Sequence, residues 1–342
     1  TKDDLAASKI LTCCCTAKTD ILIDAIDLSA LQDFQMNKIF ADDVRIFMDS
    51  WNAAYGNKIL HILFLINLAE KNNKLPIMYR GSNLDNIFNF KFDTIDVKDL
   101  NIKEYFFIEK DSFYIQNSFL KFVKSYYRFY DKRLESVIVK HYKHFLERRN
   151  FLNSNLPDRD IKIRGHFFDF ELMPEFNIFE KYLEIKPELI SYIKNKYQDV
   201  ESHKSIAVHY RGTDFKDFMA HLFPKGLQVD KDYYEKAIDI AEAQLGSDLT
   251  YHLFSDDVEY LKNIFKNRKI VIHNDKAHED WVALYLMKNV IQTNSSFCWT
   301  ASLYNKELSI QPKDGYNYHQ QSGSIPYGFG HKNSILIKKE SR

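Results

Sequence analysis

The fold of this chain is decided by the stretch Ser205-Ile206-Ala207-Val208-His209-Tyr210-Arg211-Gly212-Thr213-Asp214. Apolar residues dominate its first half, which predicts a buried strand over Ser205 to His209, and a polar loop follows from Tyr210. Apolar residues then recur at helical spacing over Tyr233 to Leu245. A buried strand that leads through a polar loop into a helix is typical of an α/β fold with a parallel sheet.

The same alternation continues on both sides of this stretch. Toward the C-terminus we expect strand Thr250 to Phe254, helix Val258 to Phe265, strand Lys269 to His273, helix Glu279 to Met287, strand Asn289 to Gln292 and helix Ser296 to Tyr304. Toward the N-terminus, strand Val44 to Ser50 and an amphipathic helix from about Asn57 to Lys71 indicate a second Rossmann-like domain.

Length and composition describe a folded chain without net charge. The 342 residues include 47 basic and 47 acidic side chains, so no global field draws the protein to nucleic acid or anionic lipid. With 27 Phe and 21 Tyr against 10 Gly and 7 Pro, the chain is aromatic-rich and globular rather than disordered. We expect two domains, residues 43–197 and 198–342, and leave residues 1–42 unassigned.

Cysteine usage and hydropathy bear on the compartment. Three of the four cysteines are consecutive, Cys13 to Cys15, and cannot form a disulfide framework, which favours a reducing environment. The longest apolar stretch, Ile59 to Ala69, is about half the ~20 residues that a membrane helix needs. We expect a cytoplasmic location, leave a peripheral contact with the inner face of the membrane open, and assign no oligomeric state.

Basic and aromatic residues interleave in a long helical stretch between Lys121 and Arg149. Such interleaving occurs in proteins that bind nucleic acid. It also describes an amphipathic helix that packs its aromatic side inward and exposes its cations, and we favour this interpretation over nucleic-acid binding. A membrane-surface contact is the remaining alternative for this stretch.

Polar residues follow the first strand, at His209 and Arg211. A guanidinium suits a diphosphate because its planar fork donates two parallel hydrogen bonds, although an arginine after a strand also commonly forms an ordinary ion pair. The second strand ends at Phe254-Ser255-Asp256-Asp257. Asp257 suits the N-cap of the next helix, which leaves Asp256 to accept hydrogen bonds from a base or a ribose.

A third polar group stands before the last predicted helix, at Asn294-Ser295-Ser296-Phe297. Unpaired N–H groups and the positive end of the helix dipole favour a phosphate there, and plain capping by a serine is the alternative. In the first half, Gly56-Asn57-Lys58 opens a helix, with a glycine that permits close backbone approach. Ligands of open parallel sheets bind beyond the carboxyl ends of the strands, so the three C-terminal groups should share one crevice.

Taken in order, these segments resemble the fucosyltransferase superfamily, most closely the bacterial α-1,2-fucosyltransferases and more distantly the α-1,6 and protein O-fucosyltransferases. The similar segments are Ala54 to Lys58 for the family's Gly-x-Gly-Asn-Gln, Gly165 to Phe168 for Gly-Tyr-Phe-Gln, His209 to Asp214 for His-Val-Arg-Arg-Gly-Asp, Phe254 to Asp257 for Phe-Ser-Asp-Asp, and Asp280 to Met287 with Asn294 to Trp299 for the Asp-x-x-Leu-Met and Asn-Ser-Ser-Phe-Ser-Trp-Trp block. The resemblance spans roughly Val44 to Ile310.

The resemblance implies a GT-B arrangement of two Rossmann-like domains that face a cleft, with the acceptor side in residues 43–197 and the nucleotide sugar in residues 198–342. It implies inverting, metal-independent transfer of fucose from GDP-fucose to a hydroxyl of a glycan or glycoconjugate acceptor, without a cofactor. The implied donor-binding residues are Asn57, His209, Arg211, Asp256, Asn294, Ser295, Ser296 and Phe297. Arg211 is also assigned to catalysis, and Asp214, Asp217 and His221 are open choices for a general base.

Three departures from the family pattern keep the donor sugar open. Gly212 stands in place of a second arginine, Lys58 in place of a glutamine and Thr300 in place of a second tryptophan. Either Arg211 suffices at the phosphates, or Lys58 or Lys216 compensates, or the donor differs. The alternatives are a transferase of the same fold with another nucleotide-activated sugar, and a non-catalytic protein that binds a nucleotide sugar or a glycan.

Metal-dependent transferases place Asp-x-Asp directly after a hydrophobic strand. Asp158-Arg159-Asp160 and Asp230-Lys231-Asp232 have this spacing but lie in charged loop sequence. We therefore expect no metal site at either position.

Overall fold

The computed structural model divides the chain into two compact units, Thr1–Asp43 and Val44–Arg342. It describes residues 45–48, 54–79, 82–95, 106–107, 161–163, 170–212, 229–313 and 333–338, all of which belong to the second unit. Several sequence predictions lie outside these residues: the cysteine run at 13–15, the basic and aromatic stretch at 121–149, the Asp158-Arg159-Asp160 spacing and the segment Gly165 to Phe168. The predicted boundary between residues 197 and 198 stays a prediction.

The C-terminal half contains a six-stranded sheet in the order β10-β9-β8-β11-β12-β13, and every neighbouring pair is parallel. Numbered along the chain, this is 3-2-1-4-5-6, the strand order of a Rossmann fold. The predicted α/β class with a parallel sheet is confirmed. The elements are β8 (Ser205–Tyr210), α9 (Lys231–Leu245), β9 (Thr250–Ser255), α10 (Val258–Ile264), β10 (Lys269–His273), α11 (Ala277–Leu286), β11 (Asn289–Ile291), α12 (Ser296–Ala301), β12 (Leu308–Pro312) and β13 (Ile335–Ile337).

A second parallel sheet lies in the first half, in the order β4-β2-β1-β6-β5. Its elements are β1 (Arg45–Met48), α3 (Tyr55–Lys71), β2 (Leu75–Tyr79), β4 (Thr94–Ile95), β5 (Phe106–Phe107) and β6 (Ile161–Ile163). An antiparallel pair joins β3 (Phe88–Phe90) to β7 (Leu183–Ile185). The remaining elements are the short helices η2 (Leu84–Asn86) and η4 (Phe170–Leu172) and the α-helices α6 (Phe176–Tyr182) and α7 (Pro187–Lys196).

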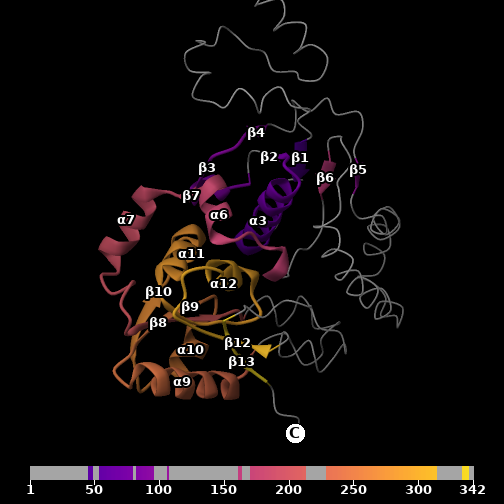
Figure 1. Cartoon of the computed structure of the whole chain (residues 1–342). Coiled ribbons are helices and arrows are strands. Elements are labelled where there is room, and N and C mark those ends of the chain that lie inside the picture. Colours follow the sequence, from indigo (N-terminus) through magenta and orange to yellow (C-terminus); the bar gives the residue numbers. More distant parts are fainter. Residues whose placement is uncertain are drawn as a thin grey trace, which may run out of the picture. The chain divides into compact units, whose positions relative to one another are not determined.

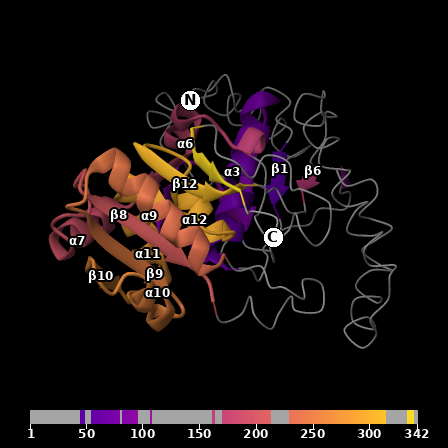
Figure 2. The same ribbon diagram turned by 90° about the horizontal axis from the view of Figure 1, so that it is seen from below.

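Helices cover both faces of the C-terminal sheet, with α9 and α10 on one face and α11 and α12 on the other (Figures 1 and 2). Alternate residues of β8 face opposite layers: Ile206 and Val208 pack with α9 and α10, whereas Ala207 packs with α11 and α12. This alternation follows from the two-residue period of a strand. Because both faces are covered, all six residues of β8 are buried.

Two predicted helices differ from the observed ones. α12 ends at Ala301 rather than Tyr304, since the Ser302 hydroxyl donates to the Cys298 carbonyl at 2.8 Å and Asn305 turns the chain with φ 59°. α3, predicted to be amphipathic, is buried on nearly every side from Ile59 to Ala69. A helix that is apolar all round belongs inside a protein. Within the described part of the chain, no helix has the length and apolarity needed to cross a bilayer.

Helix α3 packs against α12 of the other half of the unit, and the two lie side by side in both views (Figures 1 and 2). The contact is closest at Gly56, which is buried in the first turn of α3. A Cβ atom added there would lie 2.3 Å from the backbone nitrogen of Phe297 and 2.4 Å from the backbone carbon of Ser296. The glycine therefore permits the close approach that the sequence indicated, and the partner is the backbone of α12.

Replacement of Gly56 by alanine should destabilise the protein. The added methyl group meets backbone atoms, which cannot rotate away, so we expect the free energy of unfolding to fall by about 2 kcal/mol despite the better helix propensity of alanine. Urea unfolding followed by circular dichroism measures the change. Lys71→Ala, at the exposed end of the same helix, is the matched control and should stay within about 0.5 kcal/mol of the wild type. A Gly56→Ala variant as stable as the wild type would contradict the packing described here.

Candidate functional site

The carboxyl ends of β9, β8 and β11 lie next to one another, because these strands are neighbours in the sheet. The strand order reverses between β8 and β11, and a crevice for ligands forms outside a parallel sheet at such a point. The polar groups predicted after these three strands are His209 with Arg211, Asp256, and Asn294 to Phe297.

His209, near the end of β8, joins the β8 and β11 ends. Its Nδ1 lies 3.1 Å from the Thr293 hydroxyl, and its ring centroid is 5.8 Å from that of Phe297. The Tyr234 hydroxyl of α9 donates to its backbone carbonyl at 2.7 Å. Burial and the nearby Arg211 charge lower the pKa of His209 to about 3, against the opposing effect of Asp256. The imidazole is therefore neutral at physiological pH and acts through hydrogen bonds rather than charge.

Arg211 and Asp256 both lie near this imidazole, since the charges of both act on its pKa. The side chain of Asp256 accepts a hydrogen bond from the Gly212 backbone N–H at 2.7 Å. One carboxylate oxygen of Asp256 therefore fixes the loop that carries Arg211, a role that the sequence did not indicate, and the binding of a ligand by Asp256 stays a prediction. Asp257 caps α10 by accepting from the Tyr260 N–H at 3.3 Å, as predicted.

The turn between β11 and α12 brings a helix N-terminus to the same edge. Asn294 and Ser295 are buried there, whereas Ser296 and Phe297 are half-buried. The first turn of α12 has no acidic residue, and its N-cap Ser295 makes no side-chain capping bond. The first turn of α3 likewise has no acidic residue and no side-chain cap.

The two helices meet at their N-termini, because Gly56 of α3 lies against Phe297 of α12. Helix N-termini carry partial positive charge and unpaired N–H groups. Together with the guanidinium of Arg211, they make this edge of the sheet suitable for an anion such as a diphosphate.

Other predicted residues lie elsewhere. Asn57 is half-buried in the first turn of α3, and Lys58 beside it donates to the Ser82 carbonyl at 2.7 Å, so its ammonium is engaged within the first half. The three choices for a general base, Asp214, Asp217 and His221, lie outside the described residues, as does Lys216. Asp230 caps α9 by accepting from the Tyr233 N–H at 3.1 Å, which gives it a structural role.

Two departures from the family pattern have packing reasons. A Cβ atom on Gly212 would lie 2.7 Å from the Tyr210 ring and 3.0 Å from Cβ of Asp257, so a larger residue requires a local shift. The Thr300 hydroxyl accepts from the indole N–H of Trp281 at 3.0 Å and donates to the Ser296 carbonyl at 2.9 Å. Both residues are buried, and the threonine gives the Trp281 N–H the partner that a buried indole requires.

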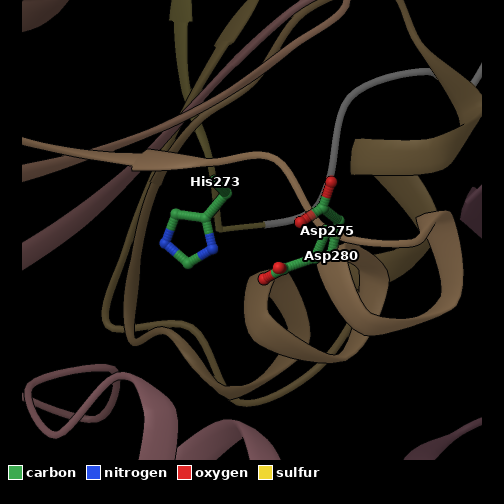
Figure 3. Close-up of side chains that lie close together, drawn as sticks. All are labelled: His273, Asp275 and Asp280. Atoms are coloured by element: carbon green, nitrogen blue, oxygen red, sulfur yellow. The ribbon is translucent and has the colours of Figure 1, made fainter.

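Two features of this edge were not predicted. The Thr293 hydroxyl contacts the His209 side chain and the Tyr234 hydroxyl donates to the His209 carbonyl, and neither residue was among those expected at the site. At the end of β10, His273, Asp275 and Asp280 come together with ligand atoms within 4.8 Å of one another (Figure 3). Burial, and secondarily the Asp275 charge, raise the pKa of Asp280 to about 7. Among the described residues, this cluster is the place suited to a metal ion.

Two solved structures, both with a TM-score of 0.50, share the fold of this chain. The fucosyltransferase NodZ from Bradyrhizobium has a TM-score of 0.50 and 12% identity, covering 76% of this chain and 93% of its own. NodZ alpha-1,6-fucosyltransferase co-crystallized with GDP has a TM-score of 0.50 and 13% sequence identity, and the match covers 76% of this chain and 92% of its own. POFUT1 in complex with GDP has a TM-score of 0.43 and 10% sequence identity, and the match covers 87% of this chain and 99% of its own. No match is found among curated protein sequences.

The family model described as Glycosyl transferase family 11 matches residues 134–315, more than half of the chain. The match includes β8, β9, β11 and α12, which carry the site described above. The protein is therefore a glycosyltransferase and belongs to glycosyl transferase family 11.

Proposed function

We propose that the protein transfers fucose from GDP-fucose to a hydroxyl of a glycan acceptor, with inversion at the anomeric carbon and without a metal ion at the diphosphate. The observation that carries this proposal is the meeting of Arg211, His209 and the α12 N-terminus at the strand-order reversal. The family membership supports sugar transfer, and the GDP complex of NodZ alpha-1,6-fucosyltransferase supports the choice of nucleotide.

The chemistry of transfer fits this set of groups. As the sugar leaves its nucleotide, positive charge develops on the anomeric carbon and negative charge on the diphosphate. Fixed donors beside the diphosphate stabilise this transition state more than the ground state. Arg211 supplies a bidentate cation, and the amides of Ser296 and Phe297 at the start of α12 supply further donors. These groups take the place that a divalent ion has in metal-dependent transferases.

His209 has a supporting part in this proposal. The buried imidazole is neutral, so it adds no charge to the stabilisation of the diphosphate. Its contacts with Thr293 and Phe297 place it between the loop of Arg211 and the turn of α12. In this proposal, His209 holds the loop of Arg211 and the turn of α12 in fixed positions beneath the nucleotide.

A transferase of the same fold that uses another nucleotide-activated sugar is the second candidate, and Gly212 is the observation that favours it. An arginine at this position would add a cation beside the phosphates. Here, the close contacts that a Cβ atom would make with Tyr210 and Asp257 favour glycine. Consumption of GDP-fucose, GDP-mannose and UDP-sugars in parallel separates the two candidates.

The proposal predicts that Arg211→Ala reduces fucosyl transfer by roughly 10²–10³-fold, because a donor to the developing charge is lost. Arg211→Lys should recover only part of the rate, since a point charge does not reproduce the bidentate fork. Release of GDP from GDP-fucose in the presence of an acceptor mixture measures the rate. Lys262→Ala, which removes a surface ion pair with Glu259, is the control and should leave the rate unchanged. An Arg211→Ala enzyme with wild-type turnover would refute the assignment.

Asp256 gives a test that separates loop support from direct base recognition. If its oxygen mainly holds the Gly212 N–H, Asp256→Asn keeps an acceptor and should retain GDP affinity within a few-fold, whereas Asp256→Ala should weaken it about tenfold, or ~1.4 kcal/mol. Calorimetric titration with GDP measures both variants. Equal losses in Asp256→Asn and Asp256→Ala would instead show that the charge of the carboxylate contacts the nucleotide.

A further inference from the structure

The cluster of His273, Asp275 and Asp280 lies at the carboxyl end of β10 and the start of α11, apart from the proposed diphosphate site. β9 separates β10 from β8, so the cluster is two strands away from the strand that carries His209. Figure 3 shows the Asp275 and Asp280 side chains turned toward the same side of the His273 ring. None of the three residues has a role in the transfer mechanism proposed above.

His273 is fixed on all sides. It is 1% exposed, and its ring lies between those of Tyr197 and Phe254, with centroid distances of 4.0 and 3.9 Å. Its Nε2 is 2.9 Å from Nδ1 of His252, which is itself fully buried. Nε2 of His252 then lies 3.4 Å from a carboxylate oxygen of Asp199, whose side chain is 42% exposed.

This chain of contacts determines which nitrogen of His273 carries the proton. Nε2 of His252 makes no hydrogen bond, but the Asp199 carboxylate at 3.4 Å would repel a lone pair there and so favours a proton on this nitrogen. Nδ1 of His252 then accepts from Nε2–H of His273. In a neutral His273, Nδ1 is then unprotonated and has a lone pair that can accept a hydrogen bond or bind a metal ion. That atom is buried and has no hydrogen-bond partner, and the nitrogen next to the Cβ-bearing ring carbon faces the two aspartates in Figure 3.

The two carboxylates add further acceptors to the same space. Oδ1 of Asp280 is buried without a hydrogen-bond partner. Asp275 accepts from the Lys196 ammonium and, at 2.7 Å, from the Tyr197 hydroxyl, and its oxygens retain lone pairs. His273 is buried and the two aspartates are partly buried, so the repulsion among these three converging acceptors is only partly screened by water. The Lys196 ammonium contacts Asp275 alone, and a shared proton or a metal ion between the three groups would relieve the rest of this repulsion.

We propose that Nδ1 of His273 and the carboxylates of Asp275 and Asp280 bind one divalent transition-metal ion, for which Zn²⁺ is the best match, with water as the fourth ligand. One imidazole and two carboxylates form a mixed nitrogen and oxygen set that suits Zn²⁺. Metal-bound histidines regularly donate their other N–H to an acceptor that fixes the ring, and the His252 and Asp199 relay supplies that second layer.

The three side chains need to move only a short distance to bind a zinc ion. Zinc ligands at 2.0–2.2 Å from a tetrahedral ion lie about 3.4 Å apart, against separations of up to 4.8 Å here. Asp275 can close this gap by releasing Lys196, whose side chain is 36% exposed and can extend into solvent. Lys196 is therefore a competitor of the metal, and an occupied site would tie the end of β10 to the first turn of α11.

Calorimetric titration of the tag-free, chelator-treated full chain with ZnCl₂ tests the proposal. We expect one ion per chain, a loss of affinity of at least tenfold in His273→Gln and in Asp280→Asn, and roughly tenfold weaker binding in Asp199→Asn, where only the relay is changed. Lys196→Met should bind more tightly than the wild type. His278→Gln, on the first turn of α11 but outside the cluster, is the matched control and should bind as the wild type does.

A second measurement tests the proposal independently of His273→Gln, in case that variant folds poorly. Co²⁺ bound by the wild type should show the intense visible bands of four-coordination, and these should be lost in Asp280→Asn, whose fold is checked by its thermal transition without metal. No stoichiometric Zn²⁺ binding by the wild type, or equal binding by Asp280→Asn, would overturn the proposal and leave a proton on Asp280 as the cation of this cluster.

Discussion

The parallel pairing of β8 with β9 on one side and β11 on the other is the constraint on which the rest of this structure depends. It sets three strand ends in a row at the point where the strand order reverses. His209, Arg211, Asp256 and the start of α12 meet because their strands end there, although His209 and Phe297 are 88 positions apart along the chain (297 − 209). The site is thus a consequence of topology, and side-chain contacts such as that of His209 with Thr293 refine it.

The contact at Gly56 extends this arrangement to the first half of the chain. Two helix N-termini without acidic residues face the same place, a juxtaposition that is unfavourable unless an anion offsets it. Because the approach is backbone to backbone, the first turn of α3 cannot move without disturbing the turn of α12. The two halves are therefore coupled through their backbones at the edge of the sheet where we propose that the nucleotide sugar binds.

Much of the C-terminal fold could be predicted from the sequence because its signals are local. The apolar run before His209 and the helical period after Lys231 each lie within one element. Asp257 is an N-cap residue and so indicates where α10 begins. The candidate binding residues came from the same local patterns and from the family resemblance, and their contact with a ligand stays a prediction. What escaped prediction depends on distant partners. The burial of α3 requires both halves of the unit, and the loop-holding role of Asp256 requires Gly212, in the loop after the neighbouring strand β8. The relay from Asp199 through His252 to His273 spans three segments, none of which has a motif.

A crystal structure of the full chain grown with GDP tests the central claim most directly. The account predicts the diphosphate at the end of β8, with its oxygens within hydrogen-bond distance of the Arg211 guanidinium and of the backbone N–H groups of Ser296 and Phe297. A nucleotide bound at another edge of the sheet, or Arg211 directed away from the phosphates in the complex, would contradict it.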